Sequence, residues 1–290
     1  MKPVLVVVHI YYSNLWSELR NYLANITVPY DLYVTTIKEN EFLKKKILDF
    51  NPSAHFEIVE NRGYDVGPFI HILNQVDLDK YSYLIKLHTK RDVPPSPKIF
   101  RGLIANKWRE YCCAFLATKE KFNQYLNAFD KDPALGMQAD YHIIVHHDFY
   151  DKIAQKKTKK WLKLRNCPRI NYAFVAGTMF FVRAHLFKEI QDLHLSLADF
   201  DSVKKGEHKT QLAHTFERLF GYFVYKQGYR LDDSLASLKV QKKYEKSIYL
   251  KKKLKMLAHL FYQQKITVSG YLLIKIFKIP VYRRKYVSTD

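Results

Sequence analysis

Short apolar runs alternate with segments of helical periodicity over the first ninety residues. The run Val4–Val8 is continuous and β-branched, which is typical of a strand buried on both faces of a mostly parallel sheet. The same alternation predicts strands at 4–10, 30–36, 56–59 and 81–87, with helices between them near 15–23, 41–50 and 68–73. This strand–helix order predicts an α/β fold built from right-handed crossovers.

The pattern changes after Asp92, where closely spaced prolines at 94, 95 and 97 predict a surface loop. The elements predicted beyond it are helices at 101–116, 120–129 and 211–227, a strand at 173–182 interrupted by Gly177, and an exposed loop or helix at 152–163. The composition shifts abruptly after Asp233. We therefore predict one domain at 1–238, which carries the candidate site residues, and a separate segment at 239–290.

Charge is distributed unevenly along the chain. Lys and Arg outnumber Asp and Glu by 48 to 28, and roughly half of the excess lies beyond residue 238. A hydrophobic content of 48% suffices for a sizeable core and excludes global disorder. Three cysteines, two of them adjacent, form no disulfide framework and fit a reducing compartment. Without an uncharged apolar run of about eighteen residues, the sequence predicts a soluble or peripheral, cytoplasmic protein.

The segment 239–290 combines many lysines with apolar residues at helical spacing. One predicted helix face consists of Val240, Tyr244, Ile248, Leu254, Leu257 and Phe261. A basic amphipathic helix lies on anionic lipid, so we expect this segment to hold the protein at the inner face of the cytoplasmic membrane. A second apolar stretch at 271–281 carries lysines that can reach headgroups. The alternative is a solvated helical appendage that packs on the catalytic domain or on a second subunit.

Polar residues follow each of the four predicted strands. Because the carboxyl ends of parallel strands meet at one edge of a sheet, these residues are expected to line one crevice. The turn 61–67 is the most informative, since it places a guanidinium, a carboxylate and two glycines between a strand and a helix. Its carboxylate, Asp65, can accept a hydrogen bond from a base or a ribose. The candidate ligand-binding residues are His9, Tyr11, Thr36, Asn61, Arg62, Gly63, Asp65, Lys86, His88 and Lys90. A glycine-rich turn that only caps the helix is the alternative for this turn.

The fourth strand places three basic residues on one face, because side chains alternate along a strand. These residues are Lys86, His88 and Lys90. A lysine on a central strand is costly to bury unpaired, so it is expected to face an anion. A diphosphate is the natural candidate, since cations there stabilise the departing charge. The alternative is an exposed edge strand that carries charges.

Four motifs occur in order at Glu60–Pro68, Leu84–Lys90, Phe174–Phe180 and His214–Phe220. Together they resemble the rhamnan-synthesis F family, bacterial glycosyltransferases of polysaccharide and lipopolysaccharide assembly, over roughly residues 1–235. The resemblance implies a GT-A-like, Rossmann-type fold and a nucleotide-sugar donor, with dTDP-rhamnose suggested by the family name. It implies a growing glycan, lipid-linked or an oligosaccharide, as the acceptor. It implies nothing for the basic C-terminal segment.

One departure from the typical GT-A pattern concerns the metal. Such enzymes place Asp-x-Asp at the end of the fourth strand to hold a divalent cation, whereas this chain has His88-Thr89-Lys90. No metal cofactor is therefore expected, and the basic residues, with Arg62, are expected to replace its charge. A metal recruited by Asp199 or Asp201 is the alternative. Three histidines lie close together in the sequence, but no carboxylate stands at the spacing of a metal site, so they are not expected to bind a metal. They are His142, His146 and His147.

The second half is expected to bind the acceptor and to supply the base. Inverting sugar transfer needs a carboxylate within hydrogen-bond reach of the acceptor hydroxyl. Glu217 is the candidate, because a helix-borne Glu recurs at this place in related GT-A enzymes. Its alternative role is an ion pair with its neighbour or a solvent-facing position. The acceptor-binding candidates are Gly177, Thr178, His214 and Arg218, and the reserve bases are Asp232 and Asp233.

Two other functions are compatible with the composition. A pI near 9.6 and 15% aromatic residues permit a nucleic-acid-binding protein. The sequence contains no recognised nucleic-acid module and no basic stripe along aromatic positions, so no nucleic-acid partner is expected. An inactive homologue that serves as a scaffold for glycan assembly is the other alternative.

Overall fold

The structure, a computed structural model, describes residues 3–91, 107–148, 151–203, 211–244, 246–247, 250, 262–266, 271–276 and 279–285. The chain divides into two compact units. The first comprises Met1–Asp92 and Lys107–Ala236, and the second comprises Val93–Asn106 and Ser237–Asp290. The predicted Pro-rich loop and the predicted start of the helix at 101–116 lie outside the described residues.

The first half forms the predicted alternation of strands and helices. The strands are β1 (Val4–Ile10), β2 (Tyr30–Thr36), β3 (His55–Ile58) and β4 (Tyr83–His88), all parallel, with β1 between β2 and β4. The helices are α1 (Trp16–Leu23), α2 (Glu41–Phe50) and α3 (Val66–Leu73). Their bounds agree with the prediction to within two residues, because continuous apolar runs and helical periodicity are strong signals.

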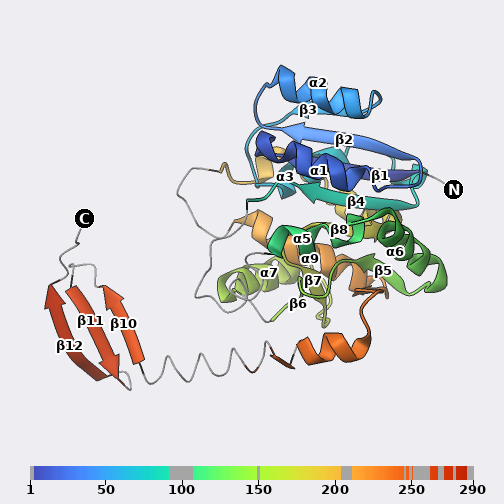
Figure 1. Ribbon diagram of the computed structural model, residues 1–290. Coiled ribbons are helices and arrows are strands. Elements are labelled where there is room, and N and C mark those ends of the chain that lie inside the picture. Colours follow the sequence, from blue (N-terminus) through green and yellow to red (C-terminus); the bar gives the residue numbers. More distant parts are fainter. Residues whose placement is uncertain are drawn as a thin grey trace. The chain divides into compact units, whose positions relative to one another are not determined.

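Three further strands extend this sheet to seven, in the order β3-β2-β1-β4-β8-β5-β9 (Figure 1). They are β5 (Leu135–Gln138), β8 (Phe180–Arg183) and β9 (Arg230–Asp232). The strand β8 runs antiparallel to both β4 and β5, and β9 runs parallel to β5. The carboxyl ends of the other six strands therefore share one edge with the amino end of β8. The predicted mixed α/β fold is confirmed, although β5 and β9 were not predicted.

The strand predicted at 173–182 is wrong as a single element. It is divided between β7 (Ala173–Val175), which pairs antiparallel with β6 (Ile144–His146), and β8 of the main sheet. The break lies at Gly177 and Thr178, which have φ of +90° and +55°. Left-handed backbone of this kind turns the chain out of a strand.

Helices cover both faces of the main sheet. Their bounds in the second half are α5 (Trp108–Cys112), α6 (Lys119–Lys131), α7 (Lys152–Leu164), α8 (Lys188–Gln191) and α9 (Leu212–Lys226). The short 3₁₀ turns are η1 (Ser13–Leu15), η2 (Leu78–Lys80), η4 (Ala114–Leu116), η5 (Ala184–Phe187) and η6 (Leu197–Asp199). The segment 152–163, predicted as a loop or a helix, is the helix α7.

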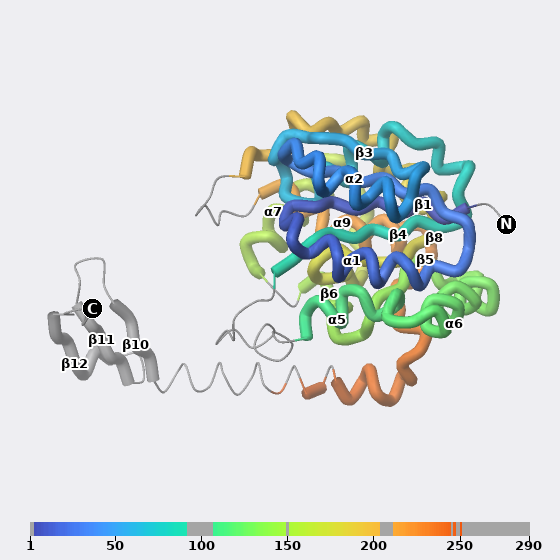
Figure 2. Tube along the Cα trace, turned by 45° about the horizontal axis from the view of Figure 1, so that its top comes forward, coloured from blue at the N-terminus to red at the C-terminus, as the bar shows by residue number. Residues whose placement is uncertain are grey.

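Neighbouring residues of β8 show how the two faces are filled. Phe180 packs against Phe69 of α3 and Phe220 of α9, with ring centroids 6.2 and 5.5 Å apart. Phe181 points to the opposite face, 5.8 Å from Phe122 of α6. On that face α1 and α2 lie side by side (Figure 2). Aromatic burial on both sides fixes the sheet that carries the site.

The second unit departs from the predicted helical tail. A helix occupies 238–244, but β10 (Tyr262–Ile266), β11 (Tyr271–Ile276) and β12 (Ile279–Lys285) form a three-stranded antiparallel sheet. Runs of Ile, Leu, Val and Tyr with short connections favour hairpins over a helix. Positions 248, 254, 257 and 261 of the predicted amphipathic face lie outside the described residues. Across the described part of the chain, every helix is too short or too polar to span a bilayer.

Candidate active site

A buried ion pair joins β4 to the start of α3. Lys86 is 1% exposed, and its Nζ donates to Asp65 Oδ2 at 2.5 Å and to the carbonyl and hydroxyl of Thr178 at 3.1 and 2.9 Å. The Thr178 hydroxyl donates to the same carboxylate oxygen. Burial lowers the pKa of Lys86, and the carboxylate opposes that shift. This corrects one expectation, because the anion that Lys86 faces is Asp65 of the same chain, not a donor diphosphate.

The same correction applies to Asp65, which was expected to accept from a base or a ribose. Burial alone would raise its pKa, but the charge of Lys86 and the hydrogen bonds from Lys86 and Thr178 hold the pKa well below the usual range. The carboxylate therefore stays ionised and binds Lys86 and Thr178 together. Lys86 and Asp65 therefore act as positioning residues below the carboxyl edge of the sheet.

This ion pair also orients Glu217 through the turn between β7 and β8. Lys86 and Asp65 hold Thr178, and the N–H of the preceding Gly177 donates to Glu217 Oε1 at 2.8 Å. The Glu217 side chain is 24% exposed, and its other oxygen lies 3.9 Å from the Arg218 guanidinium. One carboxylate oxygen is thus fixed by the backbone while the group keeps access to solvent. A carboxylate held in this way can accept a proton from a ligand hydroxyl.

Two buried histidines lie side by side at the ends of β1 and β4. His9 is paired in register with His88, and the two are 4% and 6% exposed. His9 Nδ1 lies 2.9 Å from the Thr35 hydroxyl, and Nε2 has no hydrogen-bond partner among the described residues. Burial lowers the pKa of His9 to about 4 and that of His88 well below its ordinary value, although Asp65 opposes both shifts. Near neutral pH both rings are uncharged, so His88 does not supply the positive charge expected of it.

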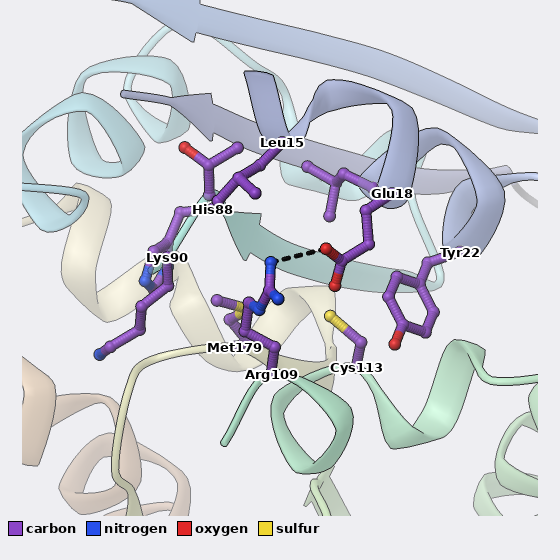
Figure 3. Close-up of a pocket in the computed structure, with 10 residues that line it drawn as sticks. Leu15, Glu18, Tyr22, His88, Lys90, Arg109, Cys113 and Met179 are labelled. Carbon is purple, nitrogen blue, oxygen red and sulfur yellow. Dashed lines mark hydrogen bonds and ion pairs between the residues drawn. The ribbon is translucent and has the colours of Figure 1, made fainter. Parts of the chain in front are cut away.

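A hollow opens between α1, the end of β4 and α5 (Figure 3). Its lining residues are Leu15, Glu18, Leu19, Tyr22, His88, Thr89, Lys90, Arg109, Cys113 and Met179. Arg109 donates to Glu18 at 2.6 Å across it, and Lys90 Nζ lies 5.0 Å from the centre of the Trp108 ring. Glu18 offsets the charge of Arg109, so the positive charge at this edge comes from Lys90 rather than from Lys86 and His88.

The loop after β1 is fastened to the end of β4. The Thr89 hydroxyl accepts from the N–H groups of Tyr11 and Tyr12, each at 2.9 Å. Tyr11 is 44% exposed and its ring packs edge-on against Tyr12. The Thr36 hydroxyl, which was expected to bind donor, is buried and donates to the Ile10 carbonyl at 3.1 Å. Tyr11 and Lys90 thus keep accessible side chains at this edge, whereas Thr36 is structural.

The turn at 61–63 binds another part of the chain. Arg62 donates to Glu60 and to the Phe200 carbonyl, both at 2.8 Å, and Gly63 N–H donates to the Asp201 carbonyl at 3.0 Å. The Asn61 carbonyl accepts from the N–H of Val203, and a Cβ on Gly63 would lie 2.7 Å from the Phe200 ring. These polar groups hold residues 200–203, and the donor-binding role expected of Asn61, Arg62 and Gly63 stays a prediction.

Two of the acceptor candidates stabilise α9 itself. His214 Nδ1 accepts from the Gln211 N–H at 3.2 Å and so caps the helix. Arg218 is 1% exposed, donates to the His214 carbonyl at 3.2 Å and lies 4.7 Å from the centre of the Phe174 ring. Burial makes direct contact between Arg218 and an acceptor sterically unfavourable. The expected role of Arg218 in acceptor binding is therefore corrected to a structural one.

The reserve bases differ in their surroundings. Asp233 is 3% exposed and accepts from the Tyr125 hydroxyl at 2.9 Å and the Tyr141 N–H at 3.0 Å. Burial raises its pKa, and these hydrogen bonds oppose the shift. Asp232 lies 3.5 Å from the Arg230 guanidinium. Asp233 thus stabilises the local fold through its hydrogen bonds with Tyr125 and Tyr141. Glu217 is therefore the more exposed of the candidate bases.

Sequence analysis missed one feature of the site, a pair formed by Asp140 and His142. Their Oδ1 and Nδ1 atoms lie 2.6 Å apart, and the His142 ring stacks on Tyr111 with centroids 4.1 Å apart. Burial raises the pKa of the nearby Cys112 thiol to about 12. The charged groups that also act on this thiol are those of Lys90, Asp140, Asp65 and Glu217. Asp140 lies two residues after the end of the unpredicted strand β5, so its place near the sheet edge was not recognised from the sequence.

Asp199, one of the two aspartates considered for a metal, binds a neighbouring residue. Asp199 caps η6 by accepting from the N–H and hydroxyl of Ser196 at 2.8 and 2.9 Å. The remaining histidines of the 142–147 cluster pair separately, His146 with Asp148 at 2.7 Å and His147 with the Tyr172 carbonyl at 3.0 Å. Within the described residues, no three of His, Cys, Asp or Glu gather as metal ligands do.

The structure is thus an α/β protein whose main sheet has a hollow at its carboxyl edge, the edge at which α/β proteins bind their ligands. Residues 1–229 match the family of rhamnan synthesis protein F, and the chain belongs to that family.

Three individual proteins are similar to this chain. Two curated relatives, both called uncharacterized protein WxcX, come from Xanthomonas campestris pv. campestris strains B100 and ATCC 33913. Each is 28% identical over 231 residues, which is 78% of this chain and 32% of the relative, so the chain spans about a third of their length. The solved structure of S. aureus TarS 1–349 has a TM-score of 0.38 and 12% identity, covering 79% of this chain and 57% of TarS.

Proposed function

We propose that residues 1–238 form a glycosyltransferase that moves a sugar from a nucleoside diphosphate to a growing cell-surface glycan. The family supports a role in polysaccharide synthesis, and its name makes dTDP-rhamnose the first donor to test. The observation that carries the proposal is Glu217, a part-exposed carboxylate oriented by a backbone amide near the cationic sheet edge.

The proposed reaction is a displacement with inversion. The acceptor oxygen forms a bond to the anomeric carbon and gives its proton to Glu217, while the bond from that carbon to the diphosphate oxygen breaks. The electron pair of the broken bond leaves with the nucleoside diphosphate. Lys90 stabilises that departing charge, and Tyr11, whose N–H is bound to Thr89 in the lining of the hollow, supports the donor. Gly177 and Thr178, which were expected to contact the acceptor, are buried, so their part in the proposed reaction is to orient Glu217.

The test measures sugar transfer and donor binding separately. Glu217→Gln keeps the hydrogen bond from Gly177 but cannot take the proton, so kcat is expected to fall by about 10²–10⁴-fold while donor affinity is retained. Lys90→Met is expected to weaken donor binding by about tenfold or more in calorimetric titration. Glu189→Gln, which removes a surface ion pair with Lys226, is the matched control and keeps the wild-type rate. Transfer by Glu217→Gln at the wild-type rate would rule out the assigned base.

The proposal also includes the place where the enzyme works. We propose that the segment 239–290 attaches the protein to the inner face of the cytoplasmic membrane, next to a lipid-linked acceptor. The support is compositional, since this segment holds roughly half of the excess positive charge. Replacement of Lys242, Lys243 and Lys246 by Gln is expected to weaken binding of the full chain to phosphatidylglycerol vesicles. Unchanged binding would leave the segment without this role.

A further inference from the structure

The helix α7 carries a positive surface that the proposed sugar transfer does not use. Its six lysines are all exposed, and Arg165 and Arg169 follow, also exposed. The lysines are Lys152, Lys156, Lys157, Lys159, Lys160 and Lys163. The one acidic residue between 151 and 169 is Asp151, and it caps the helix by accepting from the N–H groups of Ile153 and Ala154, both at 3.1 Å. No acidic residue within the helix therefore offsets this charge through pairs three or four positions apart.

The opposite side of α7 is fixed to the protein. Ala154, Thr158 and Trp161 are buried, and they recur at the spacing of one helix face. The Trp161 ring packs edge-on against Phe216 and Phe223 of α9, with centroids 5.7 and 6.4 Å apart. This packing holds the helix in one orientation, so its charged face points outward as a rigid surface.

Apolar side chains lie among the exposed cations. Ile153 and Leu164 are 63% and 69% exposed, among the most exposed large apolar residues of the described chain. With Lys157 and Lys160 they follow positions i, i+4, i+7 and i+11, which form one line along a helix. This line has an apolar residue at each end and lysines between them. In water this arrangement leaves the apolar side chains of Ile153 and Leu164 exposed, which is unfavourable.

We propose that α7 docks on an anionic phospholipid surface. Ile153 and Leu164 enter the boundary between headgroups and acyl chains, while the lysines reach the lipid phosphates with their flexible stems. A soluble polyanion such as a nucleic acid would bind the cations but would have no use for the two apolar residues. The surface belongs to the first unit and is separate from the tail segment 239–290. The inference does not require the proposed chemistry to be correct.

The first part of the test concerns the lysines. Co-sedimentation measures binding of the full chain to phosphatidylcholine vesicles with and without phosphatidylglycerol. The variant Lys156→Gln/Lys160→Gln/Lys163→Gln is expected to lower affinity for the anionic vesicles by about 10- to 100-fold. The matched control is Lys119→Gln/Lys121→Gln/Lys131→Gln on α6, which removes as many exposed lysines from a helix that also carries Glu120 and Asp130. Equal losses in the two variants, or no binding by the wild type, would overturn the proposal.

The apolar arm distinguishes a membrane from a soluble polyanion. Ile153→Ser/Leu164→Ser is expected to lower vesicle affinity by about tenfold, whereas Phe42→Ser, which truncates an exposed side chain of α2, leaves it unchanged. If the charge variant loses affinity and this apolar variant does not, the partner is a soluble polyanion and the proposal fails. Sugar transfer to a water-soluble acceptor, measured without vesicles, stays at the wild-type rate in both α7 variants. This measurement tests the proposed transferase activity independently of lipid binding.

Discussion

At the scale of single residues, Lys86 determines how the candidate site is built. A buried ammonium is tolerated only with close partners, and here Asp65 and Thr178 provide all three hydrogen bonds. The sequence predicted that this lysine needs an anion, but not which one. Asp65 is 21 positions earlier and reaches Lys86 only because the N-terminus of α3 lies beside β4 in the folded chain. Such a pairing depends on three-dimensional placement, which periodicity does not report.

Removal of the ammonium alone should destabilise the fold strongly. Lys86→Met leaves the Asp65 carboxylate without its cation in a poorly solvated site, and we expect a loss of about 3–5 kcal/mol in the free energy of unfolding, measured with urea. The double variant Lys86→Met/Asp65→Asn should recover part of that loss. Lys188→Met, which breaks an exposed ion pair with Asp79, should cost less than about 1 kcal/mol. Similar losses for Lys86→Met and Lys188→Met would show that the buried ion pair contributes no more to the free energy of unfolding than the exposed one.

At the scale of elements, the predictable part of the fold is the part with long apolar runs. The strands β1, β2 and β4 have six or seven residues, whereas β5 and β9 have four and three and include Gly136, Gln138 or Arg230. Strands that short carry no periodicity, and without β5 the importance of Asp140 could not be recognised. The break at Gly177 was visible in the sequence, but its effect was not, because left-handed backbone sends the two halves into different sheets.

The turn at Gly177 can be tested against a glycine with the same backbone demand. In Gly177→Ala the new Cβ would lie 2.8 Å from the Trp108 ring at φ +90°, whereas Gly228 has φ +82° and no atom within 4 Å. Both alanine variants should lose about 1 kcal/mol of stability from the left-handed backbone. Only Gly177→Ala should also lower kcat for sugar transfer, because it displaces the N–H that holds Glu217. A loss of activity as large in Gly228→Ala would assign the effect to stability alone.

At the scale of the whole molecule, one sheet edge collects residues from both halves of the chain. Six carboxyl strand ends and the start of β8 share that edge, so residues far apart in the sequence, such as His9 and His88, lie side by side there. This convergence was predictable for the first four strands from the rule for parallel sheets. The C-terminal sheet β10–β12 was not, because lysines between apolar residues fit a basic helix as well as a strand. The whole fold therefore brings buried, ionisable groups together at a single place.

That concentration should make the stability of the protein sensitive to mild acid. The pKa of His9 is lowered to about 4 from 6.5, so the unfolded chain takes up a proton on this residue as the pH falls through 6.5 while the folded chain does not. Stability should therefore decline between pH 6.5 and 4, by about 3 kcal/mol from His9 alone, and His88 acts with the same sign. The lowered pKa of Asp65 adds a loss only below about pH 3.8, so the two windows are separable.

Urea unfolding at a series of pH values checks this dependence. His9→Gln has no titrating ring and should flatten the decline between pH 6.5 and 4, even if it is less stable at neutral pH. His55→Gln, which replaces an exposed histidine of β3, should leave the slope unchanged. If His9→Gln keeps the full wild-type slope, proton uptake at this sheet edge does not limit stability, and the ring of His9 is not held neutral by burial.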